Sequence, residues 1–167
     1  LIKSQNNVSL ENEIFSKYTS GIRASYHDSG TTGMYTIKSS KIKDCSDGVF
    51  INFGVSVDAG TSDSPGNNRF VRNDDAINNN SSQLQFFEGN WFFGTENNPL
   101  TNPSEIISQQ VIGSSEYVDV ENPYFPSDVN GDNSTNAVDV QVVINGALGT
   151  ETPGTYPDVN ESGEVDA

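Results

Sequence analysis

The sequence predicts a mainly β chain of stacked repeats, followed by a small module built around a single helix. Three observations lead to this prediction. Short apolar segments recur at a nearly constant interval in the first hundred residues, and an acidic loop near the C-terminus occurs twice. One amphipathic helical pattern joins the two copies of that loop.

The N-terminal repeat consists of an apolar residue, a Gly or Ala six positions later, and then an aliphatic residue. The copies begin at Phe15, Ile42 and Phe70, with spacings of 27 (42 − 15) and 28 (70 − 42) residues. Such periods are typical of stacked architectures, because one unit cannot bury its own apolar face. We therefore expect these three residues to stack inward. The small residues expected to mark a tight corner are Gly21, Gly48 and Ala76.

Strands are the expected element of each repeat. The apolar runs are short, rich in β-branched and aromatic residues, and bounded by Gly, Asn, Asp and Ser, whereas helical patterns are few before residue 100. The many Asn residues fit this arrangement, because Asn tolerates left-handed corners and stacks its amides between neighbouring coils.

The end of this region resembles a known family. Residues 66–80, 88–95 and 99–103 are similar to the closing coils of right-handed parallel β-helix proteins of the pectate-lyase-like superfamily. Those proteins often end with an Asn-Trp-Trp-Gly-like stretch, and residues 90–94 read Asn-Trp-Phe-Phe-Gly. The resemblance covers residues 8–103 and implies right-handed parallel β-helix (solenoid) coils. We expect coils and a cap over residues 1–120, a linker at 121–127 and a separate module at 128–167.

The separate module begins with a twelve-residue loop that has oxygen-bearing side chains at positions 1, 3, 5, 9 and 12. A hard cation of calcium's size needs that many oxygens, and an EF-type loop supplies them at this spacing together with the backbone carbonyl of position 7. The sequence therefore predicts a Ca²⁺ site. Its expected ligands are Asp128, Asn130, Asp132, the carbonyl of Ser134, Asn136 and Asp139.

The loop pattern begins again 30 residues later (158 − 128). Between the two copies, Val140, Val143, Ile144, Ala147 and Leu148 follow the spacing of one apolar helix face, and Gly149 stands where a helix should stop. The second copy adds the expected ligands Asp158, Asn160, Ser162, Glu164 and Asp166.

Two calcium loops joined by a helix and a Pro/Gly linker resemble the dockerin type I module over residues 126–167. The resemblance implies a small α, EF-hand-like module that docks onto a cohesin-like protein. Ala137, Val138 and Gln141 of the first helix then lie near the contact. The second loop stops at Ala167 before its position 12, so we expect a fragment or a native protein that continues.

Charge and composition exclude several classes of function. The net charge is −15, and all eight Lys and Arg residues lie in the first 72 positions. Such a surface repels nucleic acid and attracts divalent cations. No apolar run is long enough to span a membrane, and one Cys allows no disulfide framework. Calcium loops of this type fill where calcium is abundant, which predicts an extracellular, secreted or cell-surface protein. The family resemblances imply a bacterial or archaeal source.

The sequence gives little evidence for a catalytic group. His27 is the only histidine and has no convergent partner in sequence, and Cys45 occupies a repeat slot that predicts an inert inward residue. Trp91 with its neighbouring Phe residues is expected to plug the end of the coils rather than to bind sugar. Stacked coils bring the acids and bases of residues 41–47 and 69–75 near one another, as in polysaccharide lyases. We assign no catalytic residue.

Three functions are compatible with these features. The first is a secreted calcium-binding β-helix protein of a carbohydrate-associated system, whose dockerin-like tail docks or anchors it. The second is a fragment of a polysaccharide lyase or hydrolase, with a polysaccharide as partner. The third is an extracellular structural subunit of a filament or surface layer, which assembles with other copies of itself.

Overall fold

The computed structural model describes residues 8–25, 33–94, 103–124, 128–130 and 136–150. The chain divides into two compact units, Leu1–Pro123 and Tyr124–Ala167, which we call the coil unit and the tail unit. The boundary after Pro123 lies inside the segment predicted as a linker, residues 121–127. Among the described residues, no helix is long and apolar enough to cross a membrane.

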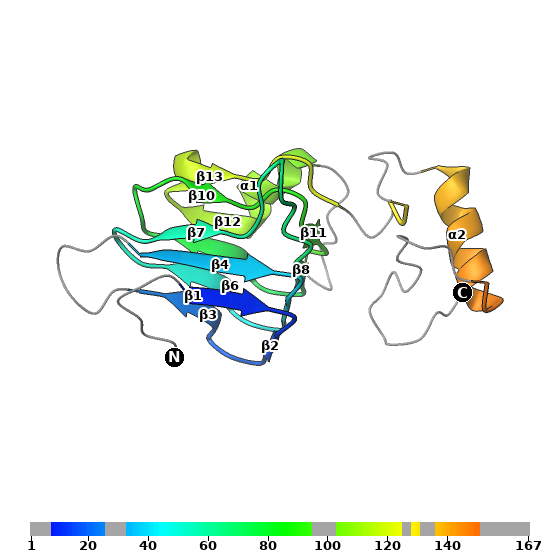
Figure 1. Cartoon of the computed structure of the whole chain (residues 1–167), viewed down its shortest axis with the longest axis horizontal. Helices are drawn as coiled ribbons and strands as arrows, with labels where there is room; N and C mark the ends of the chain where they lie inside the picture. Colours follow the sequence, from blue (N-terminus) through cyan, green and yellow to red (C-terminus); the bar gives the residue numbers. More distant parts are fainter. Residues whose placement is uncertain (1–7, 26–32, 95–102, 125–127, 131–135, 151–167) are drawn as a thin grey trace. The chain divides into compact units, whose positions relative to one another are not determined.

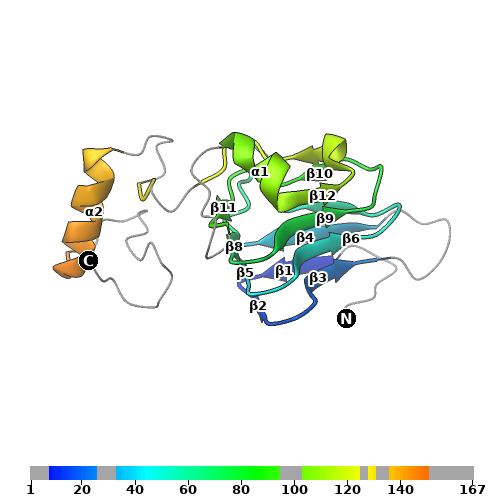
Figure 2. The same cartoon turned by 180° about the vertical axis from the view of Figure 1, so that it is seen from behind.

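The coil unit contains three parallel sheets, here named A, B and C (Figures 1 and 2). Sheet A joins β1 (Val8–Glu11), β4 (Met34–Lys38), β7 (Ser56–Asp58), β10 (Gln85–Phe86) and β13 (Val118–Asp119). Sheet B joins β2 (Ile14–Ser16), β5 (Lys41–Lys43), β8 (Arg69–Val71) and β11 (Trp91–Phe92). Sheet C joins β3 (Ser20–Ala24), β6 (Asp47–Ile51), β9 (Asp75–Asn79) and β12 (Val111–Gly113).

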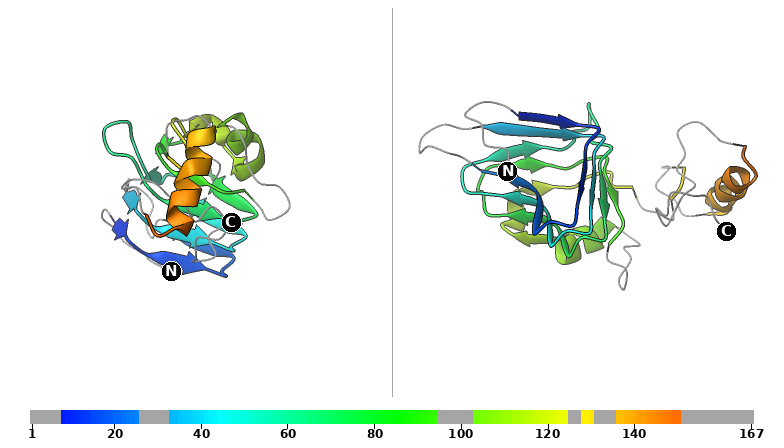
Figure 3. Two further views of the ribbon diagram at one scale, coloured as in Figure 1. Left: turned by 90° about the vertical axis from the view of Figure 1, so that its right-hand side faces the viewer. Right: turned by 90° about the horizontal axis from the view of Figure 1, so that it is seen from below.

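The chain visits the sheets in the repeating order A, B, C. Each strand therefore pairs in parallel with the strand one circuit earlier, and the circuits stack as coils. In the right-hand view of Figure 3, the strands line the sides of a common interior. The prediction of a mainly β fold with parallel sheets and few helices is confirmed. Stacked parallel coils fit a solenoid, while the right-handed sense and the pectate-lyase-like relationship stay predictions.

The core lies between the three sheets. The residues predicted to stack inward are in register, because Phe15 pairs with Ile42, which pairs with Phe70. The ladder continues to Phe92, whose ring stacks on that of Phe70 at a centroid distance of 5.0 Å. A second ladder in sheet C is formed by Ile22, Val49, Ile77 and Val111. All of these residues are buried except Phe15, which is half-buried in the first coil.

The expected corner residues have a different role. Gly21 and Gly48 lie inside β3 and β6, and neither has a positive φ. A Cβ added to Gly48 would lie 2.6 Å from the carbonyl oxygen of Ala76, so a small residue is needed for the approach of adjacent coils. The left-handed corners are elsewhere, and the prediction for Gly21, Gly48 and Ala76 was wrong in this respect.

Two columns of residues with positive φ flank sheet B. Between sheets A and B they are Asn12, Ser39, Asn67 and Gly89, and between sheets B and C they are Lys17, Asp44, Arg72 and Gly94. Backbone hydrogen bonds join the columns from coil to coil, for example from the Asp44 N–H to the Val71 carbonyl at 3.0 Å. Asn occupies two of these eight positions, so the expectation that it tolerates the corners holds only in part.

Asn also forms ladders inside the coils, as expected. The Nδ2 of Asn68 donates to Oδ1 of Asn90 at 2.9 Å, and Oδ1 of Asn68 accepts from the Ser40 N–H at 2.9 Å. Both amides are fully buried. They satisfy backbone groups that have no strand partner where the chain turns from one sheet to the next.

One end of the stack is covered by helical segments. Helix α1 (Pro103–Gln110) lies in the chain between β11 and β12, and the 3₁₀ helix η1 (Ser115–Tyr117) precedes β13. Figure 2 shows α1 at the end of the stack opposite β2 and β3. Ile106 of α1 is fully buried. The tail unit contains helix α2 (Ala137–Ala147).

Candidate metal centre

Helix α2 begins with a capping box at the end of the predicted calcium loop. Asn136 is the N-cap, and its Oδ1 accepts the Val138 N–H at 2.8 Å. In return, Oδ2 of Asp139 accepts the Asn136 N–H at 2.7 Å. These bonds satisfy N–H groups that the first turn of a helix leaves without partners. The end of the loop is therefore held rigidly against the helix.

Asp139 also ties the end of the loop to its beginning. Its second oxygen, Oδ1, accepts the Asn130 N–H at 3.2 Å. This bond places loop position 12 beside loop position 3, as binding of a single ion by both ends of the loop requires. Asp139 is only 3% exposed.

Asp128, the first expected ligand, is also buried, with 2% of its surface exposed. An ionised carboxylate is stable inside a protein only when charge and hydrogen bonds compensate it. The last 95 residues of the chain contain no Lys or Arg that could supply the charge. Two buried carboxylates in a loop without basic residues fit a Ca²⁺ ion.

The structure describes only part of the predicted ligand set. Asn130 is half-buried, and Asn136 is exposed with its Oδ1 engaged in the cap. Among the described residues, no three His, Cys, Asp or Glu side chains form a metal-binding group. Seven expected ligands lie outside the described residues: Asp132, Ser134, Asp158, Asn160, Ser162, Glu164 and Asp166.

Sequence reasoning missed the capping role of Asn136 and Asp139, which it interpreted only as metal ligands. The signal was present, because an Asn followed three residues later by an acidic residue at the start of an apolar helical run is typical of a capping box. The two roles are compatible at Asp139, since a carboxylate has about four lone-pair sites.

The residues expected at the partner contact are at the exposed start of α2. Ala137 and Gln141 are exposed, and Val138 is 54% exposed. The amide of Gln141 donates to Oδ1 of Asn145 one turn later at 2.9 Å.

The apolar residues of α2 do not form a buried face. Val140, Ile144 and Leu148 have the predicted helical spacing but are all exposed, whereas the buried aliphatic residue is Val142. Exposed aliphatic side chains on a short helix are typical of an interaction surface.

Several of the candidate acids and bases in residues 41–47 and 69–75 are engaged in contacts between coils. Arg72 donates through Nε to Oδ1 of Asp44 at 2.9 Å and through Nη2 to Oδ2 at 3.3 Å. Asp47 accepts hydrogen bonds from Ser20 and Asn78. Stacking therefore brings these groups together as predicted, but as contacts between coils. His27 lies outside the described residues, and Cys45 is buried as expected.

Asp75 provides a pH-dependent prediction. Burial, followed by the charges of Asp47 and Asp74, raises the pKa of Asp75. A carboxyl whose pKa is raised by folding stabilises the protein below its unfolded-state pKa, and this contribution is lost as the pH rises through the folded-state pKa. Asp75→Asn should therefore increase the free energy of unfolding modestly at pH 7 and little at pH 3, as measured by urea denaturation. Glu11→Gln, at an exposed acid, should show no such difference, and an equal effect of both variants would contradict the assignment.

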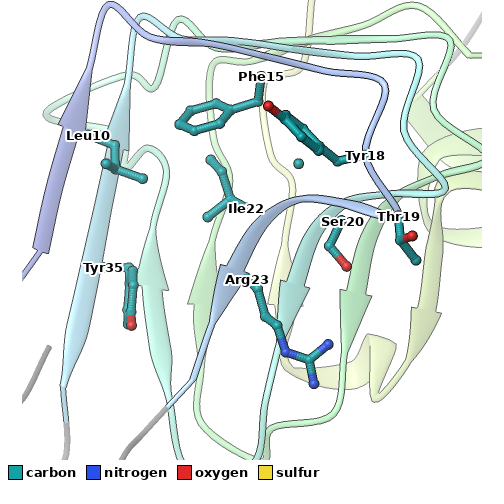
Figure 4. Close-up of a pocket in the computed structure, with 9 residues that line it drawn as sticks. Leu10, Phe15, Tyr18, Thr19, Ser20, Ile22, Arg23 and Tyr35 are labelled. Carbon is teal, nitrogen blue, oxygen red and sulfur yellow. The ribbon is translucent and has the colours of Figure 1, made fainter. Parts of the chain in front are cut away.

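A hollow of about 520 Å³ opens on the first coil (Figure 4). The side chains of Leu10, Phe15, Tyr18, Ile22 and Tyr35 contribute an apolar lining. Within the described part of the chain, strands β1, β2 and β3 are each paired on one side only. The hollow is thus the open end of the apolar interior between the sheets.

Comparison with known proteins identifies the tail. A family model described as the dockerin type I domain matches residues 126–167. Searches of curated proteins and of solved structures found no match to the chain. The match begins two residues before Asp128 and includes both predicted loops and α2. The chain therefore carries a dockerin type I domain at residues 126–167.

Proposed function

We propose that the chain is a secreted protein that docks onto a protein partner through its calcium-loaded tail. The match of residues 126–167 to the dockerin type I domain carries this proposal. Dockerin type I domains typically bind calcium and cohesin partners. A cohesin-like protein is accordingly the proposed partner, and an extracellular carbohydrate-associated system is the proposed setting.

Calcium has a structural role in this proposal. Asp128, Asn130 and Asp139 supply ligands from both ends of the first loop, together with the expected ligands between them. The ion neutralises carboxylates that are otherwise buried without basic residues nearby in sequence. It also fixes the loop from which α2 begins, and so orders the helix that presents the partner contact.

The proposed contact is the first turn of α2. Ala137, Val138 and Gln141 are exposed, and the capping box holds this turn in a fixed direction. An ordered helix with exposed aliphatic residues can enter a groove on a partner without the entropy cost of folding on binding.

For the coil unit, we propose a right-handed parallel β-helix that the tail anchors in place. No reaction is assigned to it: Arg72 pairs with Asp44 across adjacent coils, and Asp47 accepts a hydrogen bond from Asn78. Docking of the tail would therefore fix where the coil unit is held. Residues 121–127 are the proposed linker between the two.

Substitution of Val138 tests the proposed contact. Val138→Asp in the full chain should weaken binding to an immobilised type I cohesin module at least tenfold in millimolar calcium, because a charge would be desolvated in the interface. Thr150→Asp is the matched control, since Thr150 is also exposed on the tail unit but lies beyond α2 and outside its exposed aliphatic residues. Surface plasmon resonance gives both affinities. Equal losses in the two variants, or none, would place the contact elsewhere.

A further inference from the structure

The outer face of sheet B carries a row of basic side chains, and we call this surface the basic face. Neighbouring strands place four residues in register along the stack: Ile14, Lys41, Arg69 and Trp91. They alternate with the buried ladder of sheet B and therefore lie on the outer side of the sheet. Lys43, two residues after Lys41 on β5, lies on the same side. In Figure 2, strands β2, β5, β8 and β11 follow one another along one side of the coil unit.

The corner between sheets B and C adds two further basic residues to this face. Lys17 is exposed, and the side chain of Arg72 is 36% exposed although it pairs with Asp44. Sheet B and this corner comprise residues 14–17, 41–44, 69–72 and 91–94. They contain five basic residues and one acid, a net charge of +4 (5 − 1), whereas the rest of the chain carries −19 (−15 − 4). Positive charge is thus concentrated on one face of a strongly acidic protein.

An aromatic side chain lies at the end of the basic row. Trp91 is next in register to Arg69, and its ring stacks on that of Phe93 at a centroid distance of 6.4 Å. Phe92 and Phe93 are buried at the end of the core, whereas Trp91 is only half-buried. An indole at the surface offers a broad apolar face together with a polar N–H group. Basic and aromatic groups therefore lie side by side on the basic face.

We propose that the basic face binds a linear acidic polysaccharide. Its carboxylates would pair with Lys41, Lys43 and Arg69, while one sugar ring stacks on Trp91. Neighbouring strands of a sheet are about 4.8 Å apart, close to the length of one pyranose ring, so a straight chain along the stack meets about one coil per sugar. Arg pairs with a carboxylate through two parallel N–H donors and Lys acts as a point charge. This binding requires neither calcium nor the tail unit, and so goes beyond the docking function.

Charge favours a single polysaccharide chain over a broader anionic partner. The net charge of −19 outside the basic face repels duplex nucleic acid or an anionic membrane, because either extends well beyond one sheet. A single glycan chain stays within the width of the short strands of sheet B. At physiological salt, charges more than about 8 Å away are largely screened, so the local positive charge dominates for such a ligand.

Isothermal titration calorimetry of the full chain with a hexamer of β-1,4-linked glucuronate tests the proposal. Cellohexaose is the matched neutral ligand, because it has the same backbone with hydroxymethyl groups in place of carboxylates. We expect the glucuronate hexamer to bind about tenfold more tightly than cellohexaose or better, and to weaken as salt is raised. Its affinity should be the same in calcium, in EDTA and in Asp128→Ala. These three conditions separate this binding from docking, which depends on calcium in the tail.

Two double variants locate the site. Lys43→Gln combined with Arg69→Gln should weaken binding of the hexamer about tenfold, since each exposed ion pair contributes a factor of up to about five. Arg23→Gln combined with Lys38→Gln removes the same residue types from sheets C and A and should bind like the wild type. Circular dichroism checks that both variants keep the β-sheet signal.

Four results would overturn the proposal. They are an absence of binding to the glucuronate hexamer, equal affinity for cellohexaose, equal affinity for an oligothymidylate of the same charge, and equal losses in the two double variants. The third would show attraction of any polyanion rather than recognition of a sugar chain. The fourth would show that the overall charge of the protein, and not the basic face, determines binding.

Discussion

Removal of calcium with EDTA should unfold the tail unit while the coil unit keeps its β-sheet signal. Asp128 and Asp139 are both buried and are the expected ligands at the two ends of the loop, so loss of the ion removes the contacts that hold these ends together. Helix α2 also has little core of its own, since Val142 is its one buried aliphatic residue. Binding to the folded state alone contributes about 2.7 kcal/mol when free calcium is 100 times the dissociation constant.

Circular dichroism during a calcium titration measures this effect. Asp128→Ala should lose the part of the helical signal that comes from α2 even in calcium, whereas Glu116→Ala, at an exposed acid of the coil unit, should behave like the wild type. A single transition in which helix and sheet signals disappear together on addition of EDTA would argue against separate units.

Phe70→Ala should be the most destabilising single substitution in the coil unit. Phe70 is 1% exposed, stacks on Phe92 and contacts Phe87 at a centroid distance of 6.0 Å. Its removal leaves a cavity where adjacent coils meet, and substitutions of this type typically cost about 3–5 kcal/mol. The loss should appear in the coil unit alone.

Phe53→Ala is the matched control, because it deletes the same side chain at a position that is 75% exposed. We expect it to change the free energy of unfolding by less than about 0.5 kcal/mol. Urea denaturation followed by the β-sheet signal compares the two. A similar loss in both variants would show that the ladder through Phe70 is not the core of the unit.

Two of the three sheets could be predicted from the sequence. The repeat through Phe15, Ile42 and Phe70 is the register of sheet B, and the aliphatic residue seven positions after each of these lies in sheet C. The signal was strong because the chain between these two sheets has nearly the same length in each coil.

Sheet A could not be predicted from the sequence, because the length of chain between its paired strands varies from coil to coil. Thr36 pairs with Asp58 after 22 residues (58 − 36), whereas Asp58 pairs with Phe86 after 28 (86 − 58). The turn between β6 and β7 is short and the loop before β8 is long, so the period is preserved in sheet B and lost in sheet A. The inward position of Gln85, which bonds to the Val57 N–H at 2.7 Å, also interrupts the apolar pattern.

The positions of the left-handed corners, where residues have positive φ, could not be predicted from the residue types. Lys17, Asp44 and Arg72 adopt positive φ although no local preference favours Lys or Arg there. Hydrogen bonds between coils impose this conformation, as from the Arg72 N–H to the Gly94 carbonyl at 3.0 Å. Interactions between residues far apart in sequence thus override the local preference.

The proximity of the two ends of the loop was predictable because the residues that form it are close in sequence. Spacing alone predicted Asp128, Asn130 and Asp139, and the bond between the last two brings both ends of the loop together. The ion pair of Arg72 with Asp44 is the opposite case. The two residues are 28 positions apart in sequence, and only the stacking of coils brings them together.

Calcium-dependent binding of the full chain to a type I cohesin module tests the central claim most directly. Isothermal titration calorimetry should detect a one-to-one complex in millimolar calcium, no binding after addition of EDTA, and recovery when calcium is restored. Asp128→Ala should not bind under any of these conditions. Equal affinity with calcium and with EDTA, or no binding by a calcium-loaded and folded tail to any cohesin module tested, would contradict the proposed docking function.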